Sequence, residues 1–380
     1  MDFLGVDHVE FYVGDARQAA FVLCSAFGFR LYGQGGPETG LPGQRSLLLG
    51  QGDCRVLLTS GLQPDHPAVD YVARHGDGVA VIAFGTPDAA AAYQGAVAGG
   101  ATAIEAPQTF ERDGASVVTA TVSGFGDVVH RLVQREGSDQ EFLPGAIEML
   151  ELPPPTGPEL LLTIDHAAVC VPDGQLETTV DYYRKAFGFH LIFEEYIEVG
   201  KQGMFSQVVQ SQGGGVTLTL IQPDLSRSPG QIDDFLAWHD GPGVQHLALS
   251  SHDIIAAVDA LGERGVGFAS TPDSYYTALD QRLGPVDLPV DRLRPRGILV
   301  DRDHWGQMYQ IFAKSLHVRR TFFWELIERH GARTFGTSNI PALYEAKERE
   351  LATVRQTVQA ALPVQAALPA QAAHSTEAAR

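Results

Sequence analysis

The chain has 380 residues, of which 44% are hydrophobic, and its 27 Lys and Arg against 46 Asp and Glu give a formal net charge of −19. This length and composition indicate a soluble globular protein with room for two domains, and exclude a disordered or fibrous chain. The negative charge disfavours nucleic-acid and membrane partners, so an acidic substrate has to be captured by a bound cation or a few aimed donors.

The amino terminus and the cysteines favour a cytoplasmic protein. No basic stretch followed by an apolar segment opens the chain, and no run of about 18 apolar residues occurs in it, so neither export nor membrane spanning is predicted. Cys24, Cys54 and Cys170 are odd in number, widely spaced and placed in or beside apolar runs, which is typical of small buried hydrophobes.

An internal repeat organises the chain. Residues 6–31 match residues 164–191, because each has a strand that opens with Asp-His, a polar turn, an amphipathic helix and then Ala-Phe-Gly-Phe. Each half divides again at 75–84 and 239–249, where an apolar strand is followed by a helix that ends at Gly. The pattern predicts an α+β fold of four strand–helix–strands modules, paired in two domains.

Further strands are predicted where β-branched and aromatic residues run between Gly or Asp. These segments are RSLLLGQ, CRVLLTS, SVVTATVS, VVHRLVQR, SQVVQS, VTLTLIQ, GILVDRD, QMYQIFA and FFWELIE. The prolines of ELPPPTGPE cannot join a sheet or continue a helix, so this segment marks the boundary between domains. We predict a first domain at 1–150, a linker at 151–159, a second domain at 160–358 that ends in a helix, and a disordered Ala/Pro/Gln tail at 359–380.

Three side chains of the second half form a candidate metal site. Alignment of the four module openings puts His8, Val81, His166 and His246 at comparable positions, so both openings of the second half carry histidine. First strands of paired modules can lie side by side and aim both imidazoles into one concavity. Glu325, in the apolar strand FFWELIE, is costly to bury without a partner and is the candidate for a third ligand.

Two imidazoles and one carboxylate are typical of iron(II) with open positions for a bidentate substrate and dioxygen, whereas a zinc hydrolase usually needs one open position. Taken singly, a strand histidine such as His8 or His166 is more often a hydrogen-bonded core residue. The first half has Val81 in place of a histidine at its second opening, and its last strands offer no matching buried acid, so it is predicted to bind no metal. Other histidines beside Gly, Asp or Arg are predicted to be solvated in loops: His75, His239, His304 and His330.

The second half also carries a family resemblance in dispersed motifs that occur in one order. They are IDH at 164–166, YYRKAFGF at 182–189, GQIDDFL at 230–236, GVQHLAL at 243–249, TPDSYY at 271–276, QIF at 310–312, and ELIERHG followed by FGTSNIPALYEA. By these motifs the chain resembles the 4-hydroxyphenylpyruvate dioxygenase family of the vicinal-oxygen-chelate superfamily, over nearly its whole length apart from the tail. One departure is Trp324, where the family usually has Phe or Leu.

The resemblance implies a non-haem iron(II) dioxygenase that acts on an α-keto acid, with His166, His246 and Glu325 as the iron ligands. It implies βαβββ modules, a half-open barrel around the metal in the second domain, a carboxy-terminal lid helix, and a homo-oligomer that is a dimer or a tetramer. The partners would be an aryl-pyruvate and O2. Substrate contacts are expected at Ser206, Thr219, Gln231, Gln310, Phe312, Phe323 and Ile340. Ordinary strand polarity for Ser206 and Thr219, and core packing for Phe312, remain alternatives.

Within this family, the chain resembles the hydroxymandelate synthases. Homogentisate-forming members typically have Phe-Pro-Ile-Asn-Glu-Pro where residues 218–223 read LTLIQP, and Gly-Asn-Phe where residues 338–340 read SNI. Ile340 and Thr219 would change the room around the substrate ring, so that the benzylic carbon faces the oxidant. The resemblance thus implies 4-hydroxymandelate as the product and a role in making building blocks of peptide antibiotics.

Three alternative functions remain. The nearest is the production of homogentisate from the same substrate. A ring-opening extradiol dioxygenase would share the fold and the ligands, and would consume oxygen with a catechol but not with the keto acid. A non-catalytic binding protein on the same scaffold would take up no iron.

Overall fold

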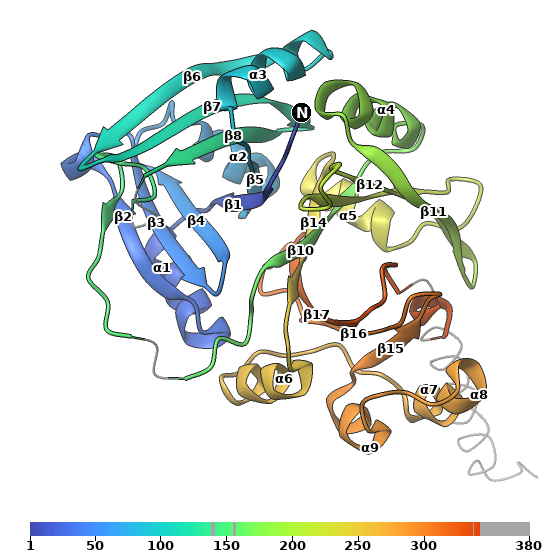
Figure 1. Ribbon diagram of the computed structural model, residues 1–380. Helices are drawn as coiled ribbons and strands as arrows, with labels where there is room; N and C mark the ends of the chain where they lie inside the picture. The colour runs from blue at the N-terminus through green and yellow to red at the C-terminus, as the bar shows by residue number, and fades with distance from the viewer. Residues whose placement is uncertain (138–140, 155–156, 337, 343–380) are drawn as a thin grey trace, which may run out of the picture.

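Two β-sheets of the same design follow each other along the chain, and the two halves of the molecule lie side by side (Figure 1). The structure is a computed structural model that describes residues 1–137, 141–154, 157–336 and 338–342. In each half, the first strands of two modules pair antiparallel at the centre of the sheet, β1 with β5 and β10 with β14. The predicted α+β architecture of paired βαβββ modules is confirmed.

The first sheet has the strand order β6-β7-β8-β5-β1-β4-β3-β2-β9. Its strands are β1 (Gly5–Tyr12), β2 (Arg30–Gly35), β3 (Gln44–Gln51), β4 (Cys54–Gly61), β5 (Gly78–Gly85), β6 (Ala103–Arg112), β7 (Ala115–Phe125), β8 (Val128–Glu136) and β9 (Glu148–Met149). The helices of this half are α1 (Ala16–Val22) with its π-helical continuation η1 (Leu23–Phe27), the 3₁₀ turn η2 (Pro37–Thr39), α2 (Pro67–His75) and α3 (Ala89–Ala98).

The second sheet has the strand order β11-β12-β13-β10-β14-β17-β16-β15. Its strands are β10 (Ile164–Cys170), β11 (His190–Val199), β12 (Gln202–Gln210), β13 (Thr217–Pro223), β14 (Gly243–Ser250), β15 (Leu299–Arg302), β16 (Gln307–Phe312) and β17 (Phe323–His330). The helices are α4 (Leu176–Phe187), α5 (Gln231–His239), α6 (Ile254–Glu263), α7 (Asp273–Thr277), α8 (Leu279–Leu283), α9 (Val290–Leu293) and the 3₁₀ turn η3 (Arg294–Arg296).

The repeated Ala-Phe-Gly-Phe motif ends the first helix of each half. Gly28 follows η1 and Gly188 follows α4, with φ of 78° and 70°. Such left-handed backbone is open to glycine at little cost, and it turns the chain from the helix into the next strand. The predicted strands do not include the edge strand β11, because it is largely exposed and lacks the alternation of a half-buried strand.

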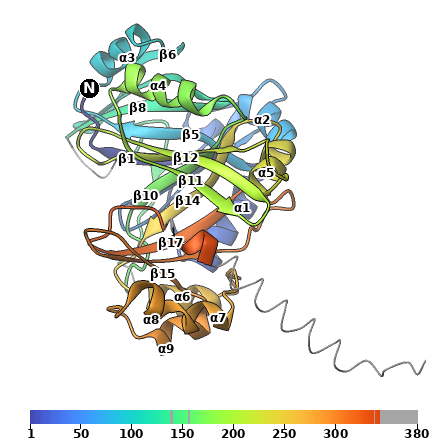
Figure 2. The same ribbon diagram turned by 90° about the vertical axis from the view of Figure 1, so that its right-hand side faces the viewer.

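The two halves meet through an aromatic interface. Trp324 of β17 packs on Phe11 of β1 and Phe27 of η1, with ring centroids 5.7 and 5.8 Å apart. Its indole therefore anchors the second half to the first, which explains why a ring larger than Phe is accommodated there. On another side of the molecule, α3 and α4 lie next to each other (Figure 2).

The prediction of solvated loops for His75 and His239 was wrong. They end α2 and α5, are 2% and 3% exposed, and stack on each other with ring centroids 4.4 Å apart. His75 hydrogen-bonds the His239 carbonyl oxygen through Nδ1 and Asp127 through Nε2. Both lie at the contact between the halves, and a pairing of helices so distant in sequence leaves no local signal.

Another interface histidine makes stability depend on pH. His130 on β8 is fully buried, and its Nε2 lies 2.8 Å from the Tyr183 hydroxyl of α4. Burial lowers the pKa of His130 from 6.5 to about 4, although a hydrogen bond with the Ile82 carbonyl acts in the opposite direction. The unfolded chain therefore binds this proton between pH 6.5 and 4 while the folded chain does not, so stability falls as pH falls through that window.

We expect His130 to account for about 3 kcal/mol of the stability lost over this window, since one pKa unit corresponds to about 1.4 kcal/mol. Denaturant unfolding of wild type and His130→Gln at pH 7 and pH 4.5 measures it, and the variant should lose less stability on acidification. His304→Gln, at an exposed site, is the control and should follow the wild type. Parallel curves for wild type and His130→Gln would contradict the assignment.

The predicted linker at 151–159 falls between the last strand of the first sheet and the first strand of the second, β9 and β10. Residues 339–342 form the start of a helix. The rest of the predicted terminal helix and the predicted tail at 359–380 lie outside the described residues. Within the described part of the chain, no helix is long and apolar enough to cross a membrane.

Candidate active site

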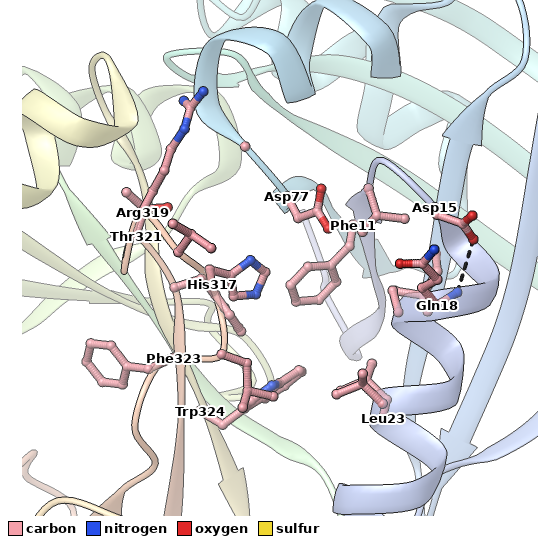
Figure 3. A pocket seen from close by; sticks show the side chains of 18 of the residues that line it. Phe11, Asp15, Gln18, Leu23, Asp77, His317, Arg319, Thr321, Phe323 and Trp324 are labelled. Carbon is pink, nitrogen blue, oxygen red and sulfur yellow. Dashed lines mark hydrogen bonds between the residues drawn. The ribbon is translucent and has the colours of Figure 1, made fainter. Parts of the chain in front are cut away.

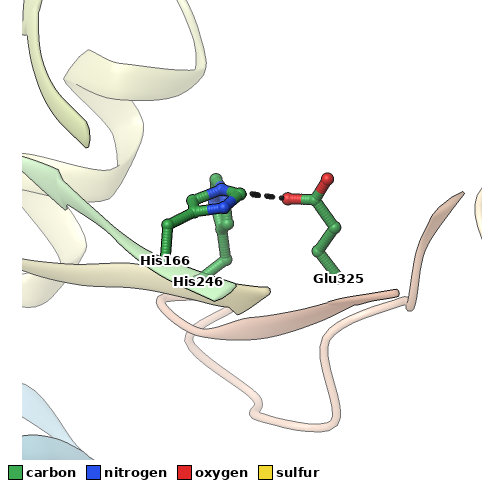
Figure 4. Close-up of side chains that lie close together, drawn as sticks. All are labelled: His166, His246 and Glu325. Carbon is green, nitrogen blue, oxygen red and sulfur yellow. Dashed lines mark ion pairs between the residues drawn. The ribbon is translucent and has the colours of Figure 1, made fainter. Parts of the chain in front are cut away.

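The three predicted metal ligands lie on three neighbouring strands, β10, β14 and β17. His166 and Glu325 pair across Ala248 of the central strand β14, and His246 stands two residues before that alanine on the same strand. A small side chain at position 248 leaves room between them. Figure 4 shows both imidazoles directed toward the Glu325 carboxylate.

The ligand atoms of this triad converge. Glu325 Oε2 lies 3.5 Å from His166 Nε2 and 3.3 Å from His246 Nε2, and all three atoms fall within 4.8 Å of one another. Two ligand atoms that are each about 2.1 Å from one ion lie at most about 4.2 Å apart, so both measured pairs fit a shared ion. No other group of three His, Cys, Asp or Glu converges in this way among the residues that the structure describes.

Each metal-facing imidazole is oriented by its preceding residue. His166 Nδ1 donates to Asp165 Oδ1 at 2.8 Å, and His246 Nδ1 donates to Gln245 Oε1 at 3.2 Å. Adjacent strand residues normally point to opposite faces of a sheet. Here the β10–β14 pairing shifts register at Asp165 and at Gln245, and these bulges put both members of each pair on one side.

The electrostatics of the triad suits a divalent cation. Burial raises the pKa of Glu325, but hydrogen bonds from His166 and His246 outweigh it and lower this pKa to about 2. Burial lowers the pKa of His166, whereas Asp165 and Glu325 raise it, to about 9. The negative surroundings that raise the pKa of His166 also favour a divalent cation, which binds the imidazole once its Nε2 is deprotonated.

All ten predicted site residues line one cavity of about 340 Å³. The triad stands at one part of its wall, with Ser206 on β12 and Thr219 on β13 at another. Gln231 comes from α5, Gln310 and Phe312 from β16, Phe323 from β17, and Ile340 from the start of the terminal helix. Phe312 and Phe323 also pack on His246, with ring centroids 6.1 and 4.8 Å from it.

The cavity contains further residues that were not predicted as site residues. Glu195, Gln245, Phe335 and Asn339 line it as well. Gln245, Phe335 and Asn339 belong to the motifs GVQHLAL and FGTSNIPALYEA, so the sequence could have identified them, and Asn339 is fully buried beside Gln310. Glu195 lies outside these motifs on β11. Among the described lining residues there is no Lys or Arg, so no ammonium or guanidinium group of this wall can bind an anionic ligand.

The first half has the same framework with different residues in the ligand places. His8 takes the place of His166, but Val81 stands at the position of His246 and Arg131 at that of Glu325. Arg131 forms an ion pair with Glu10 at 2.7 Å, and Phe142 packs on the His8 ring at 4.9 Å. A guanidinium repels a cation, and Phe142, which packs on His8, belongs to an apolar cluster with Leu48, Leu57 and Ile147.

A second cavity of about 490 Å³ lies between the halves (Figure 3). Trp324 points into it with Phe11 and Leu23, whereas Phe323 borders both cavities and directs its ring to the other side of β17. This alternation separates the interface from the triad cavity. Asp77 in this cavity accepts a hydrogen bond from the Gly14 backbone, which favours a structural role for that carboxylate.

Comparison with known proteins relates the chain to one superfamily and one set of enzymes. Residues 5–127 and 163–282 match the Glyoxalase/Bleomycin resistance protein/Dioxygenase superfamily. The chain is 31% identical to 4-hydroxyphenylpyruvate dioxygenase of Yarrowia lipolytica, over 92% of this chain and 93% of that protein. It is 34% identical to the protein of the same name from Dictyostelium discoideum, over 92% and 98%.

A solved structure is also similar. It is a mutant of 4-hydroxymandelate synthase from Streptomyces coelicolor, which is 44% identical, covers 92% of this chain and 100% of its own, and superposes with a TM-score of 0.82. A xylose isomerase-like TIM barrel/4-hydroxyphenylpyruvate dioxygenase fusion protein, 23% identical with a TM-score of 0.70, shares the fold.

Proposed function

Since the chain belongs to the 4-hydroxyphenylpyruvate dioxygenase family, we propose that it is a 4-hydroxymandelate synthase that uses iron(II) and O2. The reaction is the oxidative decarboxylation and benzylic hydroxylation of 4-hydroxyphenylpyruvate to 4-hydroxymandelate and CO2. The observation that carries the proposal is the buried triad at the wall of a cavity that has polar and aromatic side chains around it.

His166, His246 and Glu325 would hold the iron, since they supply the two imidazoles and one carboxylate that non-haem oxygenases use. When bound, iron(II) supplies open positions for a chelating α-keto acid and for dioxygen. The charge of the chain supports this assignment. A protein with a formal charge of −19 and a cavity without described Lys or Arg needs a local cation to attract a keto acid.

Ser206 and Thr219 are suited to receive the phenol end of the substrate. They are 3% and 7% exposed, and the Thr219 hydroxyl is buried without a hydrogen-bond partner among the described residues. A buried hydroxyl without a partner costs free energy, so a ligand that bonds with it gains affinity. Phe312 and Phe323 border the same cavity and would enclose the ring and exclude water.

Ile340 supports benzylic hydroxylation over attack on the ring. Its side chain packs with Ile232 and Phe235 of α5 and with Met204 of β12 at the edge of the cavity. A branched aliphatic side chain here takes less space than a phenyl ring, so the substrate ring can turn until its benzylic C–H faces the oxidant. The 44% identity to a 4-hydroxymandelate synthase mutant, against 31–34% for the dioxygenases cited above, also favours this product.

The identity of the product made from 4-hydroxyphenylpyruvate tests the proposal. Purified protein reconstituted with iron(II) is incubated with 4-hydroxyphenylpyruvate under air, and the products are separated by chromatography, with chelator-treated protein as the control. We expect 4-hydroxymandelate as the main product in the iron-loaded sample. Homogentisate as the main product would reject the synthase. Oxygen uptake with a catechol but not with the keto acid would indicate an extradiol enzyme instead.

A further inference from the structure

A guanidinium lies behind the metal-facing His166. Arg329 lies four residues after Glu325 on the same strand. It donates two hydrogen bonds of 2.8 Å to Asp165, from Nε to Oδ2 and from Nη2 to Oδ1. Asp165 in turn accepts the Nδ1 proton of His166. The bidentate geometry fixes the plane of the carboxylate, and the carboxylate fixes the imidazole with its Nε2 toward Glu325.

The same guanidinium also holds the segment that leads to the cavity wall. Arg329 Nη1 donates to the carbonyl oxygens of Ala332 at 3.2 Å and Thr334 at 2.7 Å, and its Cζ lies 5.3 Å from the centre of the Phe335 ring. Phe335 lines the cavity and packs edge-on against His166, with ring centroids 5.1 Å apart. One side chain thus sets the orientation of a metal-facing imidazole and the position of the wall beside it.

The first half repeats this arrangement without the ligand set. Arg135 holds Asp7 at 2.7 and 2.8 Å, Asp7 bonds with His8 Nδ1 at 2.7 Å, and Arg135 stacks on Phe142 at 4.9 Å and donates to its carbonyl. Because Val81 and Arg131 occupy the ligand places there, the arrangement has a packing role in this half. The chain therefore contains its own matched control for a structural role.

We propose that Arg329 is a positioning residue that orients His166 for the metal through Asp165 and holds Phe335 against the substrate, whereas its counterpart Arg135 serves packing. This inference rests on the proposed metal centre. Arg329 has no hydrogen bond with the ligand atoms of the triad in the described structure, so its effect on the metal passes through Asp165 and its effect on the substrate passes through Phe335. The inference predicts that substitution of Arg329 changes metal affinity and the KM for the substrate, and that substitution of Arg135 changes neither.

The test compares Arg329→Met with Arg135→Met by four measurements. These are Co²⁺ affinity from competition with a chelator, the visible spectrum of bound Co²⁺, the Tm of the metal-free protein, and the KM of the iron-loaded protein. We expect both variants to lower Tm to a similar extent. Arg329→Met alone should weaken Co²⁺ binding by about 10–100-fold, the usual cost of losing an outer-shell partner, shift the Co²⁺ spectrum and raise the KM for 4-hydroxyphenylpyruvate.

Arg329→Met with wild-type Co²⁺ affinity and spectrum would overturn the inference while leaving the metal centre intact. A wild-type protein that binds no Co²⁺ would overturn the metal centre and the inference with it. Should Arg329→Met not fold, Arg329→Lys and Arg135→Lys make the same comparison, because lysine keeps the charge and lacks the planar fork. Weaker Co²⁺ binding in Arg329→Lys than in Arg135→Lys supports the inference, and equal binding overturns it.

Discussion

The His166→Gln variant is expected to lose metal binding and turnover, whereas His8→Gln keeps both. The two histidines occupy equivalent places in the two halves, and each bonds through Nδ1 with the aspartate before it. They differ in what faces Nε2. His166 Nε2 lies 3.5 Å from Glu325, while His8 Nε2 is buried without a hydrogen-bond partner in the described structure, in a half whose ligand places hold Val81 and Arg131.

The loss at position 166 should be large, because one of three protein ligands disappears. We expect metal affinity to fall by more than the roughly 10–100-fold that an outer-shell change costs. Iron content after reconstitution, Co²⁺ affinity and oxygen uptake with 4-hydroxyphenylpyruvate measure the effect, and circular dichroism shows whether both variants fold. Wild-type iron content in both variants would place the metal elsewhere. Loss of iron in both variants would mean that the histidines act through folding.

Ile340→Phe is expected to move the product from 4-hydroxymandelate toward homogentisate. A phenyl ring at the start of the terminal helix takes space now shared by Ile340, Ile232 and Met204, and it restricts rotation of the substrate ring. The two products come from competing attacks after one decarboxylation, so a difference of about 1.4 kcal/mol between the two barriers changes their ratio tenfold. We expect the ratio of the two products to change by at least about tenfold.

The control is Ile340→Leu, which conserves volume and should keep the wild-type product. Both products are quantified by chromatography at matched consumption of the keto acid, so that a slower variant is not mistaken for a selective one. Thr219→Pro, tested with and without Ile340→Phe, shows whether the two positions act together. An unchanged product ratio in Ile340→Phe with retained turnover would remove Ile340 from the control of product choice.

Sequence patterns were enough to predict the repeat and the side chains that the structure gathers in one cavity. Repetition of Asp-His and Ala-Phe-Gly-Phe predicted two equivalent halves, and the module openings singled out His166 and His246. Glu325 stood out because a carboxylate in an apolar strand needs partners. These signals are local, since strand periodicity and the cost of burying a charge are written in neighbouring residues.

Tertiary structure alone decided what surrounds those side chains. The bulges at Asp165 and Gln245 arise from hydrogen bonds between strands about 80 residues apart, so no local pattern showed that each residue would share a face with the histidine after it. Pairing across the first sheet likewise put Arg131 across Ala83 from His8, and packing between the halves buried His75 and His239. Register and docking depend on contacts that only the folded chain brings together.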